Sequence, residues 1–138
     1  MEYKCMKKEI IKFSVVLSAV LFLIGGCGSK AKIQCGTLDD VVNHLKSKSL
    51  ITGESTAMEA AAIGALNGVK YEDSDVELYV YDMNSKAYKG IAENNKVKVE
   101  GFEVELEPSA VNDKFVIFCD NADKKDEIIE EFKNIEVK

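Results

Sequence analysis

The stretch VELYVYD, residues 76–82, alternates in the way expected of one strand in a half-buried sheet. The aliphatic side chains of Val76, Leu78 and Val80 share one face of this strand, which we therefore expect to contact the core. The other face carries Glu77, Tyr79 and Tyr81. Residues 69–72 form a second run, and the acidic turn EDSD between the two runs predicts a β-hairpin. This hairpin is the basis of the predicted fold.

Two further segments extend the predicted sheet. FVIFC, residues 115–119, is apolar at every position, which is typical of a central strand or a strand beneath a helix. In KVKVEGFEVELE, residues 96–107, the alternation of apolar and polar residues changes phase. The apolar residues are odd-numbered at Val97 and Val99, and even-numbered at Phe102, Val104 and Leu106. A strand cannot keep both sets on one face without a bulge or turn, so we expect an irregularity at Glu100-Gly101. Pro108 ends this segment.

Helical spacing of apolar residues predicts helices in four segments: 38–48, 57–67, 84–94 and a closing one, capped by Asn121 or Asp123, through Asn134. Thr37 and Asp40 have the spacing of a capping box before the first helix. Thr56 repeats that pattern before the second helix, and Gly68 is placed to end it. The sequence thus predicts an α+β fold of about four mainly antiparallel strands and three to four helices, preceded by an N-terminal signal helix.

The composition narrows the class of protein. With 46% hydrophobic and 30% charged residues, the 138-residue chain is globular rather than disordered. All 18 basic residues are lysine, and nucleic-acid binding is not expected, because contacts to phosphate and guanine are largely made by arginine. Residues 1–26 hold four lysines and two of the 24 acids, so the remainder carries net −8. Such a domain is repelled by anionic lipid headgroups.

The first 26 residues predict a targeting segment. Lys4, Lys7, Lys8 and Lys12 form a positive region before FSVVLSAVLFLI, an uncharged run at residues 13–24. That run is short for a bilayer-spanning helix, which needs about 20 residues, and suits a signal peptide. The alternative is an uncleaved membrane anchor, or an ordinary signal peptide in which the cysteine that follows at position 27 is incidental. Translation from either Met1 or Met6 is compatible with this pattern.

The residues that follow add a specific resemblance. Ile24-Gly25-Gly26-Cys27 resembles the lipobox of bacterial lipoproteins. The resemblance implies transfer of a diacylglycerol to the sulfur of Cys27 and cleavage before it, so that the membrane is a partner through this anchor at the extracytoplasmic face. The expected organisation is a signal peptide at 1–26, a lipidated flexible tether at 27–36 and one α+β domain at 37–138. This domain resembles small uncharacterised lipoproteins of Gram-positive bacteria, a likeness that implies no activity.

No catalytic, metal or cofactor site is predicted. The single histidine, His44, lies beside an apolar helix stripe without a cysteine or second histidine at ligand spacing, and we expect a surface or boundary role. No serine lies in a nucleophile motif, so an enzyme is not expected. The acid-rich segments 72–75 and 120–127 lack the spacing and the glycine of a calcium loop. We interpret them as a turn and a helix start.

The cysteines outside the signal peptide have separate predicted roles. Cys27 takes the lipid, which leaves Cys35 and Cys119 on the extracytoplasmic side, where a disulfide between them is permitted. The alternative is that Cys119 is a buried core thiol and Cys35 a residue of the tether.

Two strand faces are candidates for a binding surface. The first is Glu77, Tyr79 and Tyr81, because tyrosine is favoured at interfaces; the alternative is that helices cover these rings within the fold. The second is the acidic ladder of Glu103, Glu105 and Glu107, which could meet a basic partner. We therefore expect a non-enzymatic, membrane-anchored domain that binds an envelope protein or other envelope component. The alternative is a receptor for a small ligand or ion, which a concave pocket lined by several carboxylates would favour.

Overall fold

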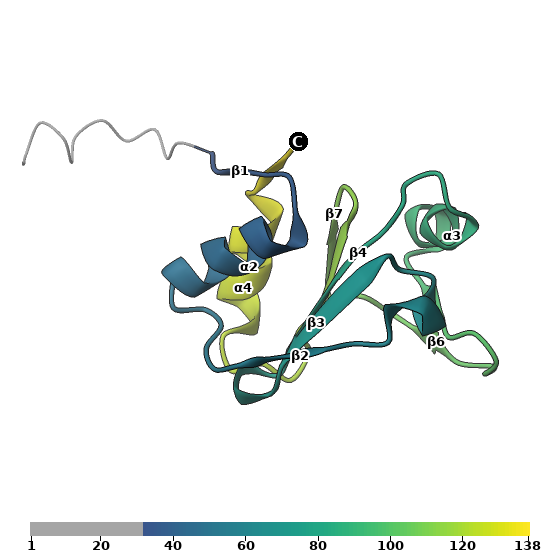
Figure 1. The fold of residues 1–138 in the computed structure, drawn as a ribbon, viewed down its shortest axis with the longest axis horizontal. Coiled ribbons are helices and arrows are strands. Elements are labelled where there is room, and N and C mark those ends of the chain that lie inside the picture. The colour runs from purple at the N-terminus through teal and green to yellow at the C-terminus, as the bar shows by residue number, and fades with distance from the viewer. Residues whose placement is uncertain (1–31) are drawn as a thin grey trace, which may run out of the picture. The chain divides into compact units, whose positions relative to one another are not determined.

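The computed structural model describes residues 32–138, which form one compact unit; the predicted signal peptide and Cys27 lie outside these residues. Within this range the chain forms three α-helices and a five-stranded antiparallel sheet (Figure 1). The helices are α2 (Leu38–Ser47), α3 (Lys86–Asn94) and α4 (Lys125–Lys133). The α+β class and the mainly antiparallel sheet predicted from the sequence are confirmed.

The sheet has the strand order β2-β3-β4-β8-β7, so β4 is the central strand. The strands are β2 (Ser55–Ala57), β3 (Asn67–Tyr71), β4 (Val76–Val80), β7 (Ala110–Asn112) and β8 (Phe115–Phe118). The predicted hairpin is confirmed, since Leu78 of β4 pairs with Val69 of β3, and its other neighbour is Ile117 of β8. Alternation along β4 therefore assigns each of its side chains to one of two opposite faces of the sheet.

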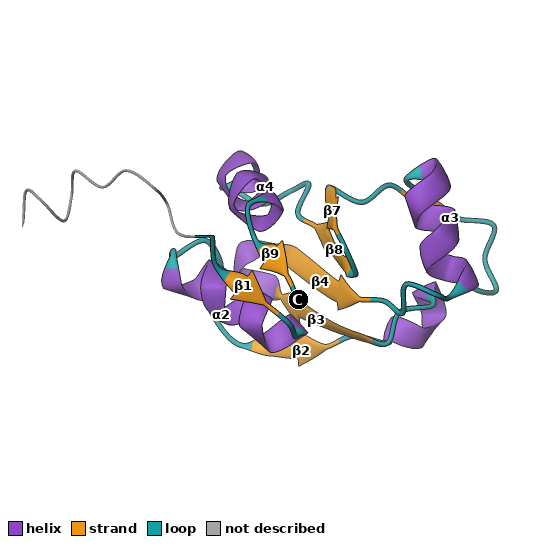
Figure 2. Cartoon of the chain, turned by 90° about the horizontal axis from the view of Figure 1, so that it is seen from above, coloured by secondary structure: helices purple, strands orange, loops and turns teal. Residues whose placement is uncertain are grey.

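Each face of the sheet has its own core. The aliphatic face of β4 packs with α2 and α4 around Leu45, Phe115 and Phe132, all fully buried. The opposite face packs with α3 and a short 3₁₀ turn, η1 (Ala60–Ile63). Figures 1 and 2 show α2 and α4 side by side and α3 well away from both. The sheet is thus covered on both faces, which the sequence suggested only for β8.

Two of the helix starts follow the sequence. Thr37 accepts a hydrogen bond from the Asp40 amide and Asp40 accepts one from the Thr37 amide, which confirms the predicted capping box of α2. Ser85 caps α3 by accepting from the Tyr88 amide. The predicted cap of α4 is wrong: the N-cap residue is Lys124, without a side-chain cap, because two turns in succession lead into this helix.

The helix predicted at 57–67 is wrong. Residues 55–57 instead form the edge strand β2, in which Thr56 pairs with Lys70, and only η1 remains helical. Gly68, predicted to end the helix, lies within β3. The alanine run keeps only a single 3₁₀ turn, because β2 and β3 take up the residues at the two ends of the predicted helix and Gly64, at φ 74°, ends the turn.

The phase change at 96–107 marks a second hairpin. Its strands are β5 (Val97–Lys98) and β6 (Glu105–Leu106), with Val97 opposite Leu106 and Lys98 opposite Glu105. This register places odd residues of one strand opposite even residues of the other. Gly101, at φ 81°, lies in the turn, which confirms the predicted irregularity.

The two ends of the described chain meet. β1 (Gln34–Cys35) pairs in parallel with β9 (Glu136–Val137), with Cys35 opposite Val137. Cys35, expected in the flexible tether, is buried and belongs to the core beneath α2. The ordered fold therefore includes residues that precede Thr37.

Candidate functional site

The tyrosine face predicted as a binding surface is buried. Tyr79 is 4% exposed and Tyr81 1% exposed, because η1 and α3 cover this side of the sheet. The Tyr79 hydroxyl donates to Glu77 Oε2 at 2.9 Å, and its ring meets that of Phe118 edge to face. The Tyr81 hydroxyl donates to the carbonyl of Ile63 in η1. The proposed binding surface of Glu77, Tyr79 and Tyr81 is therefore wrong, and the alternative that the fold covers these rings is confirmed.

Burial has an electrostatic consequence for these phenols. Removal from water raises the pKa of both Tyr79 and Tyr81 far above the ordinary value, and for Tyr79 the hydrogen bond to Glu77 and its negative charge raise it further. Both side chains therefore stay neutral at physiological pH. Their role is to link the sheet to its covering elements.

The disulfide that the sequence permits between Cys35 and Cys119 is not formed, and both thiols are free and buried; the alternative of a buried core thiol is thus confirmed for Cys119. Cys35 pairs with Val137, after the end of α4, whereas Cys119 precedes the start of that helix. Burial raises the pKa of both thiols.

His44 is a buried contact between helices rather than a surface residue. It is 7% exposed, and its Nε2 lies 2.7 Å from Oε1 of Glu131 on α4. Its Nδ1 is buried without a hydrogen-bond partner among the residues that the structure describes. The sequence did not show this pair, because Glu131 lies 87 residues further along the chain. The spacing within α2 could not reveal which helix covers it.

Three of the six exposed large hydrophobic side chains among residues 32–138 lie on the hairpin formed by residues 97–107, here called the arm. Phe102 is 72% exposed, Val104 47% and Leu106 40%. Val97 is buried beside Ile91 of α3, but beyond it the described chain leaves these three side chains uncovered. The arm therefore projects from the fold with an apolar surface.

The acidic ladder lies on this same arm. Glu103, Glu105 and Glu107 are all exposed, and contact between this ladder and a basic partner stays a prediction. Glu105 accepts from the ammonium of Lys96 at 3.0 Å. Asn95 reaches Glu107 at 3.5 Å, a long contact of little weight. The arm thus combines an apolar row with carboxylates, of which Glu103 and Glu107 have no ion-pair partner within residues 32–138.

The base of the arm is fixed to the fold. The Glu100 amide donates to the Ala62 carbonyl at the end of η1 with a separation of 2.7 Å, and the side chain of Val97 is fully buried in the second core. Phe102 closes the turn by donating its amide to the Val99 carbonyl. The exposed side chains are therefore presented from a hydrogen-bonded hairpin with a defined origin.

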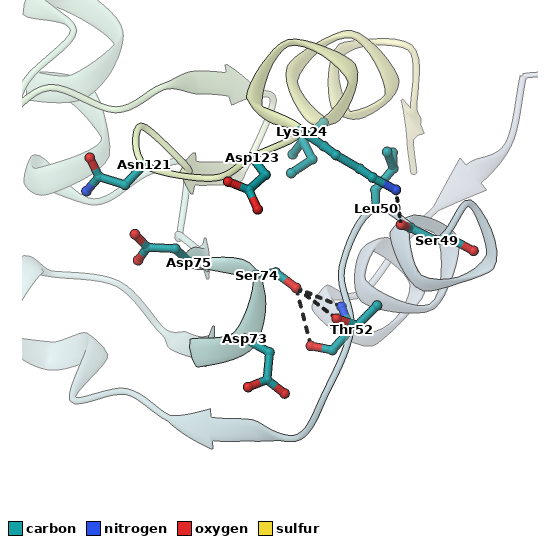
Figure 3. A pocket seen from close by; sticks show the side chains of 10 residues that line it. Ser49, Leu50, Thr52, Asp73, Ser74, Asp75, Asn121, Asp123 and Lys124 are labelled. Carbon is teal, nitrogen blue, oxygen red and sulfur yellow. Dashed lines mark hydrogen bonds between the residues drawn. The ribbon is translucent and has the colours of Figure 1, made fainter.

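The two acid-rich segments meet at a pocket of about 420 Å³. Three connections form it, namely those between α2 and β2, between β3 and β4, and between β8 and α4 (Figure 3). They converge because β4 begins where the antiparallel β8 ends, with Glu77 opposite Phe118. The pocket lining is Ser49, Leu50, Thr52, Asp73, Ser74, Asp75, Asn121, Asp123, Lys124 and Ile128. We call it the acidic pocket.

Hydrogen bonds hold the three connections of the acidic pocket together. Ser74 Oγ accepts from the Thr52 amide at 2.8 Å, and Lys124 donates from Nζ to the Ser49 carbonyl at 3.1 Å. In Figure 3 the carboxylates of Asp75 and Asp123 lie on the side of the pocket away from Ser49. Neither carboxylate, nor that of Asp73, forms an ion pair within the described range, so the pocket offers negative charge to a cation.

Three further observations bear on function. Among residues 32–138, no three histidine, cysteine, aspartate or glutamate side chains are grouped so that they could hold a metal ion. In the same range, no helix has the length and apolar character needed to cross a bilayer. Comparison of the chain with protein-family models, with curated proteins and with solved structures finds no match.

Proposed function

We propose that the chain is a lipoprotein whose non-enzymatic domain binds an envelope protein through the arm, at the outer face of the cytoplasmic membrane. The lipobox at Ile24-Gly25-Gly26-Cys27 supports the address, with Cys27 as the lipid carrier. The exposed apolar row of the arm supports the binding role. Both parts of the proposal concern recognition and anchoring, and neither requires a reaction.

The observation that carries the binding role is the exposure of Phe102, Val104 and Leu106 together on one projecting hairpin. Isolated apolar residues on a surface need no explanation, but a contiguous group marks an interaction site. Fully burying a phenylalanine or leucine side chain is worth about 1.5–3 kcal/mol, so even partial burial of the three would favour association. The neighbouring glutamates add charge complementarity, which would select a basic partner.

Photo-crosslinking from the arm tests this role. A photoreactive side chain at Glu103 of the anchored protein, in the cells that produce it, is expected to capture one reproducible envelope protein. Phe102→Ser with Leu106→Ser should abolish the capture, because it removes most of the apolar surface. Leu66→Ser is the matched control, since Leu66 is also exposed but lies outside the arm. Capture that survives the arm substitutions, or that occurs equally from Glu54, would contradict the proposal.

The acidic pocket favours a second candidate function, a receptor for a small organic cation. Asp73, Asp75 and Asp123 present their charges in a concavity of a size that small ligands occupy. Spermidine, a small polyamine, is a suitable probe for calorimetric titration. Binding lost in Asp75→Asn and Asp123→Asn but retained in Asp39→Asn would support this candidate. No saturable binding of spermidine would contradict it.

A further inference from the structure

The outer edge of β6 is an unpaired strand edge. β6 pairs with β5 on one side only, and within the described residues no strand lies on its other side. The Val99 amide donates to the Val104 carbonyl, and hydrogen-bonded pairs alternate along an antiparallel ladder. The Lys98–Glu105 pair is therefore a non-hydrogen-bonded one, so the amide and carbonyl of Glu105 point toward the free edge. An exposed edge of this kind is a template for another strand.

The edge of β6 that pairs with β5, its inner edge, shows which cross-strand neighbours are compatible with this strand. β5 has the alternating sequence Lys-Val-Lys-Val at residues 96–99. Its Val97 lies opposite Leu106, and its Lys96 forms the 3.0 Å ion pair with Glu105. Apolar residues thus face apolar ones and lysine meets glutamate, which are the favourable cross-strand combinations. The outer edge offers the same alternation of glutamate and apolar side chains.

A second copy of the arm does not satisfy this edge. Glutamates occupy 103, 105 and 107, whereas apolar residues occupy 102, 104 and 106. If two β6 strands paired antiparallel with their faces matched, each glutamate of one copy would lie beside a glutamate of the other. Like charges directly opposite one another destabilise a strand pair. The opposite pattern, alternating basic and apolar residues, avoids this repulsion.

We propose that the outer edge of β6 binds an extended segment of a partner protein in which basic and apolar residues alternate, so that it adds a strand to the arm. This inference rests on the proposed function, since it names the kind of partner that the arm binds. The main-chain hydrogen bonds of Glu105 hold the strand, its apolar residues cover Val104 and Leu106, and its basic residues meet the glutamate ladder.

A peptide that repeats the pattern of β5 is the probe. The full chain, reconstituted in nanodiscs of neutral phosphatidylcholine, is titrated with fluorescein-labelled Lys-Val-Lys-Val-Lys-Val, with empty nanodiscs as the background. Saturable binding is expected by fluorescence anisotropy, and it should weaken as salt screens the ion pairs. A photoreactive version of the peptide should crosslink to residues 103–107, as located by mass spectrometry.

Two matched comparisons separate strand addition from simple charge attraction. Glu103→Lys with Glu107→Lys should weaken binding at least about tenfold, whereas Glu54→Lys, an exposed glutamate outside the arm, should leave it unchanged. A peptide N-methylated along one edge keeps its charge but cannot complete the ladder, so it should not bind. Circular dichroism of each variant should show that the fold is retained.

The outcomes distinguish this inference from the proposed function. No binding of the peptide by the wild-type chain, or equal binding of the N-methylated peptide, would overturn strand addition. If the cellular crosslink from Glu103 still captures one protein in an arm-dependent way, the proposed function stands and only the class of partner is wrong. If that crosslink also fails, both are wrong.

Discussion

The ring of Tyr79 packs directly over Gly68, its pairing partner in the neighbouring strand β3. A Cβ atom at position 68 would overlap the Cδ1 and Cε1 atoms of that ring. Because Tyr79 is itself held by Phe118 and Glu77, the ring has little room to move. The glycine in β3 is therefore required by packing rather than by a turn.

Gly68→Ala is expected to destabilise the fold. The added methyl group overpacks the sheet, which costs about 1–3 kcal/mol in the free energy of unfolding. Gly90→Ala is the matched control, because Gly90 lies within α3 and a Cβ there meets no atom within 4 Å. That substitution should instead stabilise by about 0.5–1 kcal/mol through helix propensity. Urea denaturation measures both, and equal effects of the two substitutions would contradict the packing argument.

Asn112 should be a strong point of attachment between the sheet and α4. Its Nδ2 donates to the carbonyls of Phe132 and Ile135, both at 2.8 Å, at the end of the helix. Asn112→Ala removes both hydrogen bonds and is expected to cost about 1–3 kcal/mol. Asn43→Ala, at an exposed position on α2, should have little effect. Hydrogen exchange at the end of α4 should rise in the first variant only, and unchanged protection there would contradict this role.

Stability should fall in alkaline solution. Burial raises the pKa of Tyr79, Tyr81 and Tyr88 in the folded chain. An unfolded phenol titrates near pH 10, so below about pH 10 both states hold the proton and stability is unaffected. Above about pH 10 the unfolded state loses protons that the folded state keeps, and the free energy of unfolding decreases as pH rises.

Denaturation midpoints from about pH 8 to about pH 12, together with phenolate absorbance, measure this effect. The phenolate signal of the buried tyrosines should appear with loss of native circular dichroism. Tyr81→Phe should reduce the pH dependence, although it also removes the hydrogen bond to Ile63. Full ionisation near pH 10 with the native spectrum intact would refute the prediction.

The free energy of unfolding should also decrease in acid, because the carboxylate of Asp40 becomes protonated. The amides of Gly36 and Thr37, and then the Thr37 hydroxyl, lower the pKa of its carboxyl in the folded chain. Its contribution is therefore complete above the unfolded value of 3.8 and is lost as pH falls through the lower folded value. Asp40→Asn should flatten the acid limb of the stability curve, whereas Asp39→Asn should run parallel to wild type. Thermal denaturation against pH distinguishes the two variants.

The proposed lipid anchor predicts the mass of the mature protein. The intact mass of the protein recovered from the membrane fraction should lack residues 1–26 and should include a diacylglycerol on Cys27. Cys27→Ser should show neither change, because the acceptor sulfur is gone. A wild-type chain that keeps its first 26 residues, or that carries no lipid, would contradict the lipoprotein assignment.

Local patterns predicted the parts of the fold in which neighbours along the chain set the structure. The capping box of Thr37 and Asp40, the alternation of β4 and the turn at Gly101 all depend on residues within about one turn or one strand. The phase change between Val97 and Phe102 even marked the arm, although its meaning as a hairpin required the register.

The remaining errors concern contacts between distant segments. Alternation shows that Tyr79 and Leu78 lie on opposite faces, but it does not show that both faces are covered. Likewise, local propensity at 57–67 does not show that β3 pairs with residues 55–57 and that only a short 3₁₀ turn remains at 60–63. The acidic pocket was beyond prediction, because its aspartates come together only through the antiparallel pairing of β4 with β8.

The parallel pair of β1 and β9 has a consequence for the order of folding. Cys35 pairs with Val137, which lies 102 positions later in the sequence, so this contact waits for the last residues of the chain. Contacts of such long sequence separation form late, because the chain entropy of closing the loop must be overcome first. On the proposed export route the chain emerges from its N-terminal side, so the Cys35 thiol would stay open to oxidants until the final residues arrive. Time-resolved thiol labelling during refolding would reveal this interval, and it should end in step with docking of the last strand.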